Sequence, residues 1–146
     1  MSIESRIAEL GITLPEPAKA VANYVPFVQT GSVVHISGQL SNDASGGIKG
    51  TVGVDVTPEQ AAAAARLCGI NLLAQIKAAC DGDLDRVVRI VKLGGFVQAG
   101  PDFDLTPHCP MPMVQAGPAA YSVRNLTQPM KGLCLHPMLA ANYGRI

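Results

Sequence analysis

Apolar positions predict a short helix followed by two strands in the first third of the chain. They recur at helical spacing from Ile3 to Leu10, and Gly11 then favours the end of the helix. Residues 23–30 and 32–37 are rich in β-branched residues, which favour strands. The short break between these two strands predicts an antiparallel hairpin.

The clearest pattern predicts a long amphipathic helix from Thr57 to Cys80. Thr57 suits the capping position, Pro58 fits the first helical position, and Gln60 completes a capping box. The remainder of the segment contains no proline and one glycine, and its apolar residues gather on one face. Such a helix is expected to lie on a sheet.

One more strand is predicted over residues 86–97, after a glycine-rich loop at 41–53 and the long helix. The order is therefore strand, strand, helix, strand. This order favours an α+β fold, in which helices pack on one face of a mixed sheet.

The composition changes after Asp104. All 11 acidic residues lie in residues 1–104, whereas six of the 11 prolines and four of the five methionines lie in residues 105–146. No sustained helix or strand period is found in this tail, and its prolines interrupt both kinds of element. We therefore separate an α+β part, 1–104, from a tail, 105–146. Either a change of reading frame or a divergent end of the same domain explains the tail.

Charge and composition exclude several classes of partner. The chain has 11 basic and 11 acidic residues and only 4% aromatic residues, which argues against a nucleic-acid partner. It has no apolar run of the ~20 residues that a membrane helix needs. The first residues lack a secretory pattern, and the four cysteines form no C-x-x-C pair. We expect a cytoplasmic protein that contacts no membrane.

The segment from Tyr24 to Gln39 resembles the Rid (YjgF/YER057c/UK114) family. In that family a tyrosine precedes the first strand pair and a strand ends in S-G-Q, as Ser37, Gly38 and Gln39 do here. The resemblance covers residues 1–104 and does not extend into the tail. It continues through the glycine-rich loop, the helix start at residues 57–61, the Asn-Leu-Leu stretch at 71–73 and the strand at 88–97.

The resemblance implies a chorismate-mutase-like fold, a homotrimer and active clefts between subunits. It implies hydrolysis of reactive 2-enamine/2-imine acids to 2-keto acids and ammonia, without a cofactor. Tyr24, Ser37 and Gly38 would then be substrate-binding residues. Each of the first two has a structural alternative: Tyr24 could close a sheet edge, and the Ser37 hydroxyl could bond local backbone.

Two family groups have no counterpart in this sequence. Active members hold the substrate carboxylate with an arginine in an R-[ST]-A-V-G-like segment and carry a glutamate on the last strand. Arg124 lies at about the right distance along the chain, but its neighbours differ, and no acidic residue follows Asp104. A non-catalytic, trimeric module that binds a small metabolite is therefore the alternative function. An endoribonuclease is disfavoured by the neutral charge.

Other candidate groups indicate no further chemistry. Cys68 and Cys80 fall on the apolar side of the long helix and are expected to be buried. His35, inside a strand, is predicted to be structural. A metal-like group in the tail matches no common zinc spacing, so we predict no bound metal: His108, Cys109, Cys134 and His136.

Overall fold

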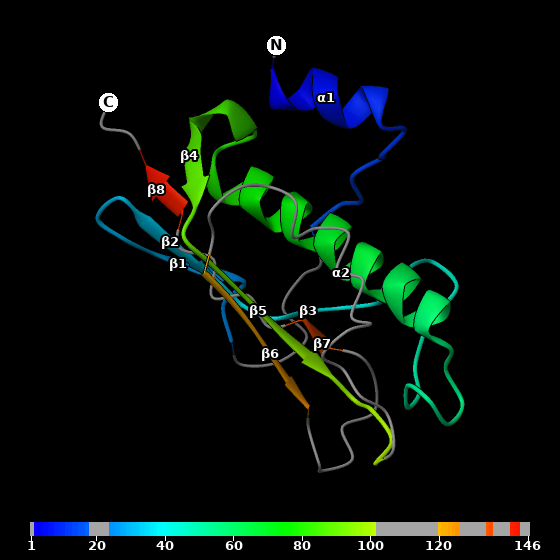
Figure 1. Cartoon of the computed structure of the whole chain (residues 1–146). Coiled ribbons are helices and arrows are strands. Elements are labelled where there is room, and N and C mark those ends of the chain that lie inside the picture. The colour runs from blue at the N-terminus through cyan, green and yellow to red at the C-terminus, as the bar shows by residue number, and fades with distance from the viewer. Residues whose placement is uncertain (1, 18–23, 102–119, 126–133, 136–140, 144–146) are drawn as a thin grey trace.

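A computed structural model describes residues 2–17, 24–101, 120–125, 134–135 and 141–143, the last three as backbone only. Figure 1 shows a long helix lying across strands, with a short helix near one end. In chain order the elements are α1 (Ile3–Glu9), β1 (Phe27–Thr30), β2 (Val33–Ile36), β3 (Gln39–Leu40), α2 (Pro58–Ala79), η1 (Leu84–Arg86), β4 (Val87–Ile90), β5 (Lys92–Val97), β6 (Ala120–Asn125), β7 (Cys134–Leu135) and β8 (Ala141–Tyr143).

The first helix and the hairpin are confirmed. Ser2 caps α1 by accepting the backbone N–H of Ser5 at 3.1 Å. Strands β1 and β2 pair antiparallel, from Phe27 opposite Ile36 to Thr30 opposite Val33. Gly31 begins the two-residue turn with φ of 59°, a conformation that glycine adopts without steric cost.

The long helix and its capping box are also confirmed. The Thr57 hydroxyl accepts the backbone N–H of Gln60, and the Gln60 side chain accepts the backbone N–H of Thr57 at 2.9 Å. These two bonds satisfy backbone donors that have no partner within the helix.

The prediction of one continuous strand over residues 86–97 is wrong, although the segment is mostly β-strand. The structure contains two strands, β4 and β5, which are separated at Val91 and pair with different partners. Arg86 belongs to the η1 turn, which Asp83 caps by accepting the Asp85 backbone N–H. A β-promoting run does not reveal this change, because it depends on pairing partners that are distant in the sequence.

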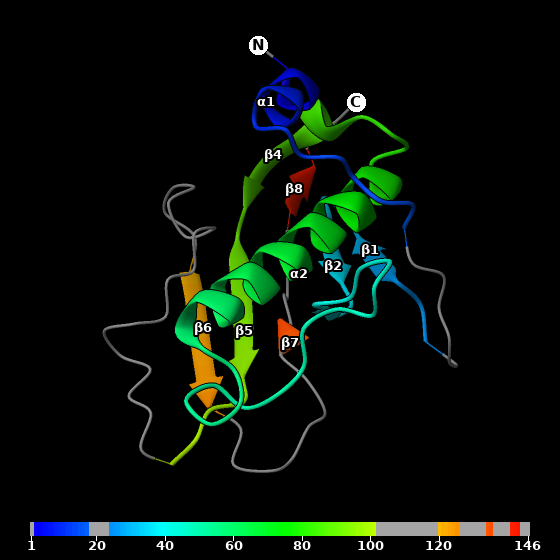
Figure 2. The same ribbon diagram turned by 90° about the vertical axis from the view of Figure 1, so that its right-hand side faces the viewer.

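The strands form two four-stranded sheets, ordered β1-β2-β8-β4 and β3-β7-β5-β6. Strands β5 and β6 pair in parallel, and the other pairs are antiparallel, so the arrangement is mixed. Strands β4 and β5 follow each other directly and link the sheets. Figure 2 shows α2 in front of the strands, as the predicted α+β fold requires.

Residues 105–146, where the sequence shows no sustained strand period, contribute three strands to the structure. Strand β6 pairs with β5, β7 pairs with β3 and β5, and β8 lies between β2 and β4. Strands β7 and β8 contain only two and three residues, too few to show a period. Their place depends on pairing with the first part of the chain.

Two apolar clusters hold α2 against the sheets. One centres on Leu72 and Ile76 of α2 with Val34 and Ile36 of β2. The other joins Ala64 and Cys68 to the region around Val52 and Val97. The buried face of α2 therefore fixes the positions of the strands and of the loops that leave them.

Candidate functional site

A cleft of about 540 Å³ opens beside α2. Its walls come from residues 13–16, from Tyr24, from the segment 38–44 that includes β3, and from the face of α2 between residues 67 and 74. A cavity of this size is within the range that accommodates small-molecule ligands.

Two of the three predicted substrate-binding residues line this cleft. Tyr24, which is 48% exposed, and Gly38 are both part of its wall. Ser37 is not among the lining residues, and its hydroxyl donates to the Val25 carbonyl at 2.6 Å. The hydroxyl thus ties the end of β2 to the backbone next to Tyr24, and Tyr24 and Gly38 meet in one cleft.

Hydrogen bonds within the segment 37–48 shape one wall of the cleft. The Gln39 amide donates to the carbonyls of Ser37 and Gly38 at 3.1 and 3.2 Å. Ser41 is buried; its hydroxyl donates to the Ile48 carbonyl at 2.7 Å, and its carbonyl accepts the Ile48 N–H at 3.2 Å. The backbone of this wall is therefore held in place from within.

Asp43 organises the adjoining turn. One of its carboxylate oxygens accepts the Ser45 hydroxyl at 2.6 Å, the Ser45 N–H at 2.8 Å and the Gly47 N–H at 3.0 Å. The Ser45 hydroxyl above all, and then these backbone N–H groups, hold the pKa of the Asp43 carboxyl below its ordinary value. Asp43 is therefore a carboxylate at neutral pH.

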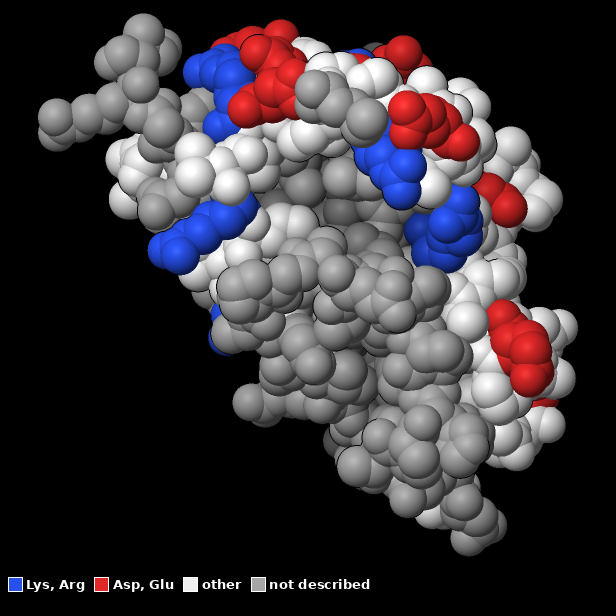
Figure 3. All heavy atoms as spheres, turned by 45° about the horizontal axis from the view of Figure 1, so that its top comes forward, with Lys and Arg blue, Asp and Glu red and all other residues white. Residues whose placement is uncertain are grey.

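The charged residues that line the cleft, among those that the structure describes, are Glu16 and Asp43, and none is Lys or Arg. An arginine or lysine that holds a substrate carboxylate is thus not found in the described wall. Figure 3 shows one face of the molecule, where acidic and basic side chains are intermixed over the described surface.

Arg124 lies on β6, with its backbone opposite Phe96 of β5; its side chain is outside the described part of the chain. The cleft residues Gln39 and Leu40 form β3, and β7 and β5 lie between β3 and β6. Three strand spacings amount to roughly 14 Å, and Figure 2 shows β6 and the β1–β2 pair on opposite sides. The backbone of Arg124 thus lies three strands away from β3 within the same sheet.

Asn71 and Asp43 are cleft residues to which sequence reasoning assigned no role. Asn71 lies in the middle of α2, where asparagine is a weak helix former. A weak helix former in the middle of a predicted helix was the signal available in the sequence. Its side-chain nitrogen donates to the carbonyls of Leu40 and Asn42, each at 2.9 Å.

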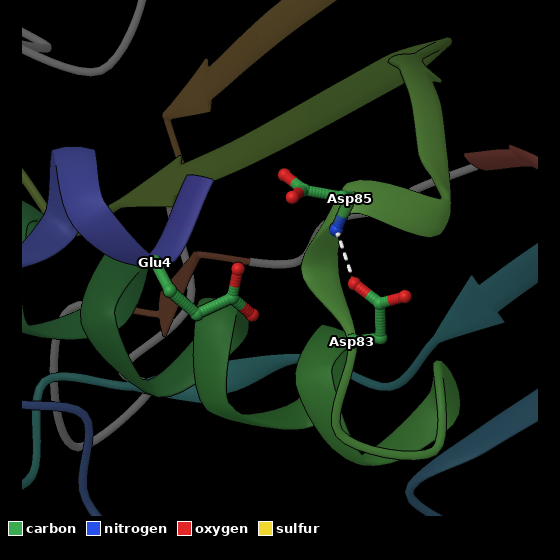
Figure 4. Close-up of side chains that lie close together, drawn as sticks. All are labelled: Glu4, Asp83 and Asp85. Carbon is green, nitrogen blue, oxygen red and sulfur yellow. Dashed lines mark hydrogen bonds between the residues drawn. The ribbon is translucent and has the colours of Figure 1, made fainter. Parts of the chain in front are cut away.

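A cluster of three carboxylates lies away from the cleft, between α1 and η1. One carboxylate oxygen from each of Glu4, Asp83 and Asp85 lies within 4.8 Å of the other two, and Figure 4 shows the three side chains close together. Glu4 accepts the Leu84 N–H at 3.1 Å, and Asp85 accepts the Ile3 N–H at 2.7 Å. These hydrogen bonds attach α1 to the η1 turn that precedes β4, which gives Glu4 and Asp85 a structural role.

The structure describes the side chains of three of the remaining candidate residues, Cys68, Cys80 and His35. Cys68 and Cys80 are buried in the apolar clusters, as predicted. His35 is an exposed residue of β2. Of the metal-like group in the tail, His108, Cys109 and His136 lie outside the described residues, and Cys134 is described only as backbone of β7. No helix in the described ranges combines the length and hydropathy of a membrane span.

Comparison with known proteins assigns the family. Residues 4–102 match the family model described as "YjgF/chorismate mutase-like, putative endoribonuclease". The curated protein TCP17 of Trypanosoma cruzi is 43% identical over 102 residues, which are 69% of this chain and 63% of TCP17. The chain thus spans less than two thirds of the length of that relative. The chain belongs to the YjgF/Rid family, as its sequence resemblance predicted.

Solved structures confirm the fold. Atu1372 of Agrobacterium tumefaciens has a TM-score of 0.77 at 34% identity, covering 96% of this chain and 92% of its own. A protein of Shewanella oneidensis, described as a putative endoribonuclease, has a TM-score of 0.84 at 30% identity, covering 97% and 99%. RidA of a Psychrobacter species shares the fold with a TM-score of 0.56 at 24% identity, covering 88% and 93%.

Proposed function

We propose that this chain binds small 2-imino and 2-keto acids in the cleft beside α2 and hydrolyses the imino acids. The observation that carries the proposal is the position of Tyr24 and Gly38, which the family resemblance singles out and which line one cleft of about 540 Å³. Membership of the YjgF/Rid family supports the same assignment.

The proposed reaction is the addition of water to a carbon–nitrogen double bond. Water attacks C2 of the imino acid, the C=N bond becomes a C–N single bond, and loss of ammonia leaves the 2-keto acid. No electrons are exchanged with a cofactor. Three of the residues that line the cleft, Tyr24, Glu16 and Asp43, carry polar groups of the kind that orient water in such reactions.

A neighbouring subunit is proposed to complete the site. The described wall has no cation for the substrate carboxylate, and the backbone of Arg124 lies three strands from β3 of its own chain. In a trimer, β6 of one subunit could face the cleft of the next, and Arg124 is the candidate for this contact because guanidinium pairs well with carboxylate.

Exposed valines on the described strands support association with further copies. His35 alternates with buried Val34 and Ile36, so it faces away from α2, and Val28 lies opposite it in the hairpin. Val28 is 50% exposed and Val88 of β4 is 65% exposed. Covering such valines removes apolar surface from water, which favours an interface.

The test generates 2-iminopropionate in solution and follows its decay with and without the protein. We expect the folded protein to accelerate decay, with matching release of pyruvate, and expect Tyr24→Ala to lose most of the acceleration. Tyr24→Phe keeps the ring and loses only the hydroxyl; a loss of acceleration in this variant as well assigns the effect to the hydroxyl, and retained acceleration assigns it to the ring. A decay rate equal to that of buffer, with correctly folded protein, rejects the enzymatic proposal.

The alternative is a non-catalytic module that binds a small acid in the same cleft. The absence of Lys and Arg from the described lining favours it. In that case 2-ketobutyrate raises the melting temperature of the protein while imino acids decay at the buffer rate.

A further inference from the structure

We infer that Asn71 is a positioning residue that holds the 38–44 wall of the cleft against α2. This inference deepens the proposed function, on which its ligand-binding part rests. The hydrogen bonds themselves are a property of the fold, so they can be tested whether or not the cleft binds an acid.

The geometry gives Asn71 a role that few other side chains could fill. One amide nitrogen carries two protons, and it meets two carbonyl oxygens, those of Leu40 and Asn42, each at 2.9 Å. These acceptors determine which end of the amide is nitrogen, because an oxygen there would face two other oxygens.

Both ends of this connection belong to the cleft. Asn71, Leu40 and Asn42 are all lining residues, and about 30 residues of chain separate the helix from the wall. The position of α2 is fixed at this point because Leu72, the residue after Asn71, is 1% exposed and packs in the apolar core. A wall tied to such an element keeps its shape before a ligand arrives.

The wall has a second attachment on its far side. Ser41, between the two acceptors, exchanges hydrogen bonds with Ile48, which packs on the cluster around Val52. Gly47 permits this close approach, since a Cβ there would lie 1.8 Å from the Ser41 carbonyl oxygen. Residues 40–42 are therefore held by Asn71 from the side of the cleft and by Ile48 from the side of the core.

The experiment compares Asn71→Asp and Asn71→Leu with the wild-type protein. Asp keeps the shape but, when ionised, cannot donate; Leu removes the polar group. We expect amide hydrogen exchange in residues 38–44 to rise about tenfold in both variants. Affinity for 2-ketobutyrate is expected to fall about tenfold. Arg66→Ala, at an exposed position of the same helix, is the matched control and should change neither quantity.

A pH signature separates hydrogen bonding from simple packing. Two facing carbonyl oxygens favour the protonated form of Asp at position 71, which can donate one bond. The melting-temperature deficit of Asn71→Asp, relative to wild type at the same pH, should shrink from pH 8 to pH 5. That of Asn71→Leu should not change.

Unchanged exchange in residues 38–44 in both variants would overturn the role of Asn71 in holding the wall. Increased exchange with wild-type affinity for 2-ketobutyrate would overturn its part in ligand binding. If the wild-type protein neither binds nor hydrolyses any imino or keto acid, the proposed function fails. The exchange and pH data would still decide whether Asn71 holds the wall.

Discussion

At the scale of the residue, Asp43 shows how a turn can be built around one carboxylate. It accepts three hydrogen bonds from Ser45 and Gly47, and its pKa is lowered as a result. Stability from a carboxyl with a depressed folded-state pKa is complete above the unfolded-state pKa and is lost as pH falls through the folded-state value.

The turn should therefore loosen in acid. We predict that melting temperature falls with decreasing pH below about 4, and that Asp43→Asn, which cannot titrate, shows a shallower fall. Thermal unfolding between pH 2 and 7 measures this difference. Equal pH profiles for Asp43→Asn and wild type would contradict the assigned role of Asp43.

The sequence indicated some cleft residues and missed others for a physical reason. Tyr24 and Gly38 belong to a recognisable local pattern, and both line the cleft. Asn71 and Leu40 meet only because the chain folds back over about 30 residues. A local pattern of apolar and polar residues does not indicate such a long-range contact, so the hydrogen bonds of Asn71 could be found only in the structure.

At the scale of the element, α2 is the best predicted part of the fold because its signals are local. Its cap, its first-turn proline and its apolar face all lie within a single stretch of chain. The break between β4 and β5 could not be predicted, because it reflects different pairing partners. Strands depend on distant residues more than helices do.

The capping box makes a measurable contribution to α2. Replacing Thr57 with Ala removes the hydroxyl that accepts the Gln60 N–H and should lower the free energy of unfolding by about 1 kcal/mol. Urea denaturation of Thr57→Ala, Gln60→Ala and the double variant forms a cycle. We expect the double variant to lose less than the sum of the single losses, since the two residues act as a pair. Strict additivity would argue against the reciprocal cap.

The packing of α2 depends on Leu72. This side chain is 1% exposed, and Leu72→Ala should lower the free energy of unfolding by about 2–5 kcal/mol, because the change removes apolar contacts and leaves a cavity. Leu10→Ala, at a 52% exposed position, should change it by no more than about 0.5 kcal/mol. Equal losses in urea unfolding would mean that α2 does not pack as described.

At the scale of the whole molecule, the proposed trimer relies on exposed valines of the strands, such as Val88. Placing a charge at Val88 should dissociate the assembly, because burying an unpaired lysine is costly. We predict a trimer for wild type and a smaller species for Val88→Lys by light scattering. Val54→Lys, at a 71% exposed loop position, should remain trimeric. A monomeric wild-type protein would refute the trimer.

The composition break after Asp104 gives a second prediction at this scale. If a change of reading frame explains it, another frame of the nucleotide sequence downstream of codon 104 should encode an R-[ST]-A-V-G-like segment and a later glutamate. Absence of both from the alternative frames would favour a divergent tail.

The central claim is that the cleft between α2 and residues 38–44 receives a small keto or imino acid. Nuclear magnetic resonance titration of the isotope-labelled protein with 2-ketobutyrate tests it most directly. We predict saturable shifts that cluster on Tyr24, residues 38–44 and the 67–74 face of α2. Saturable shifts elsewhere, with the cleft signals unmoved, would contradict the claim.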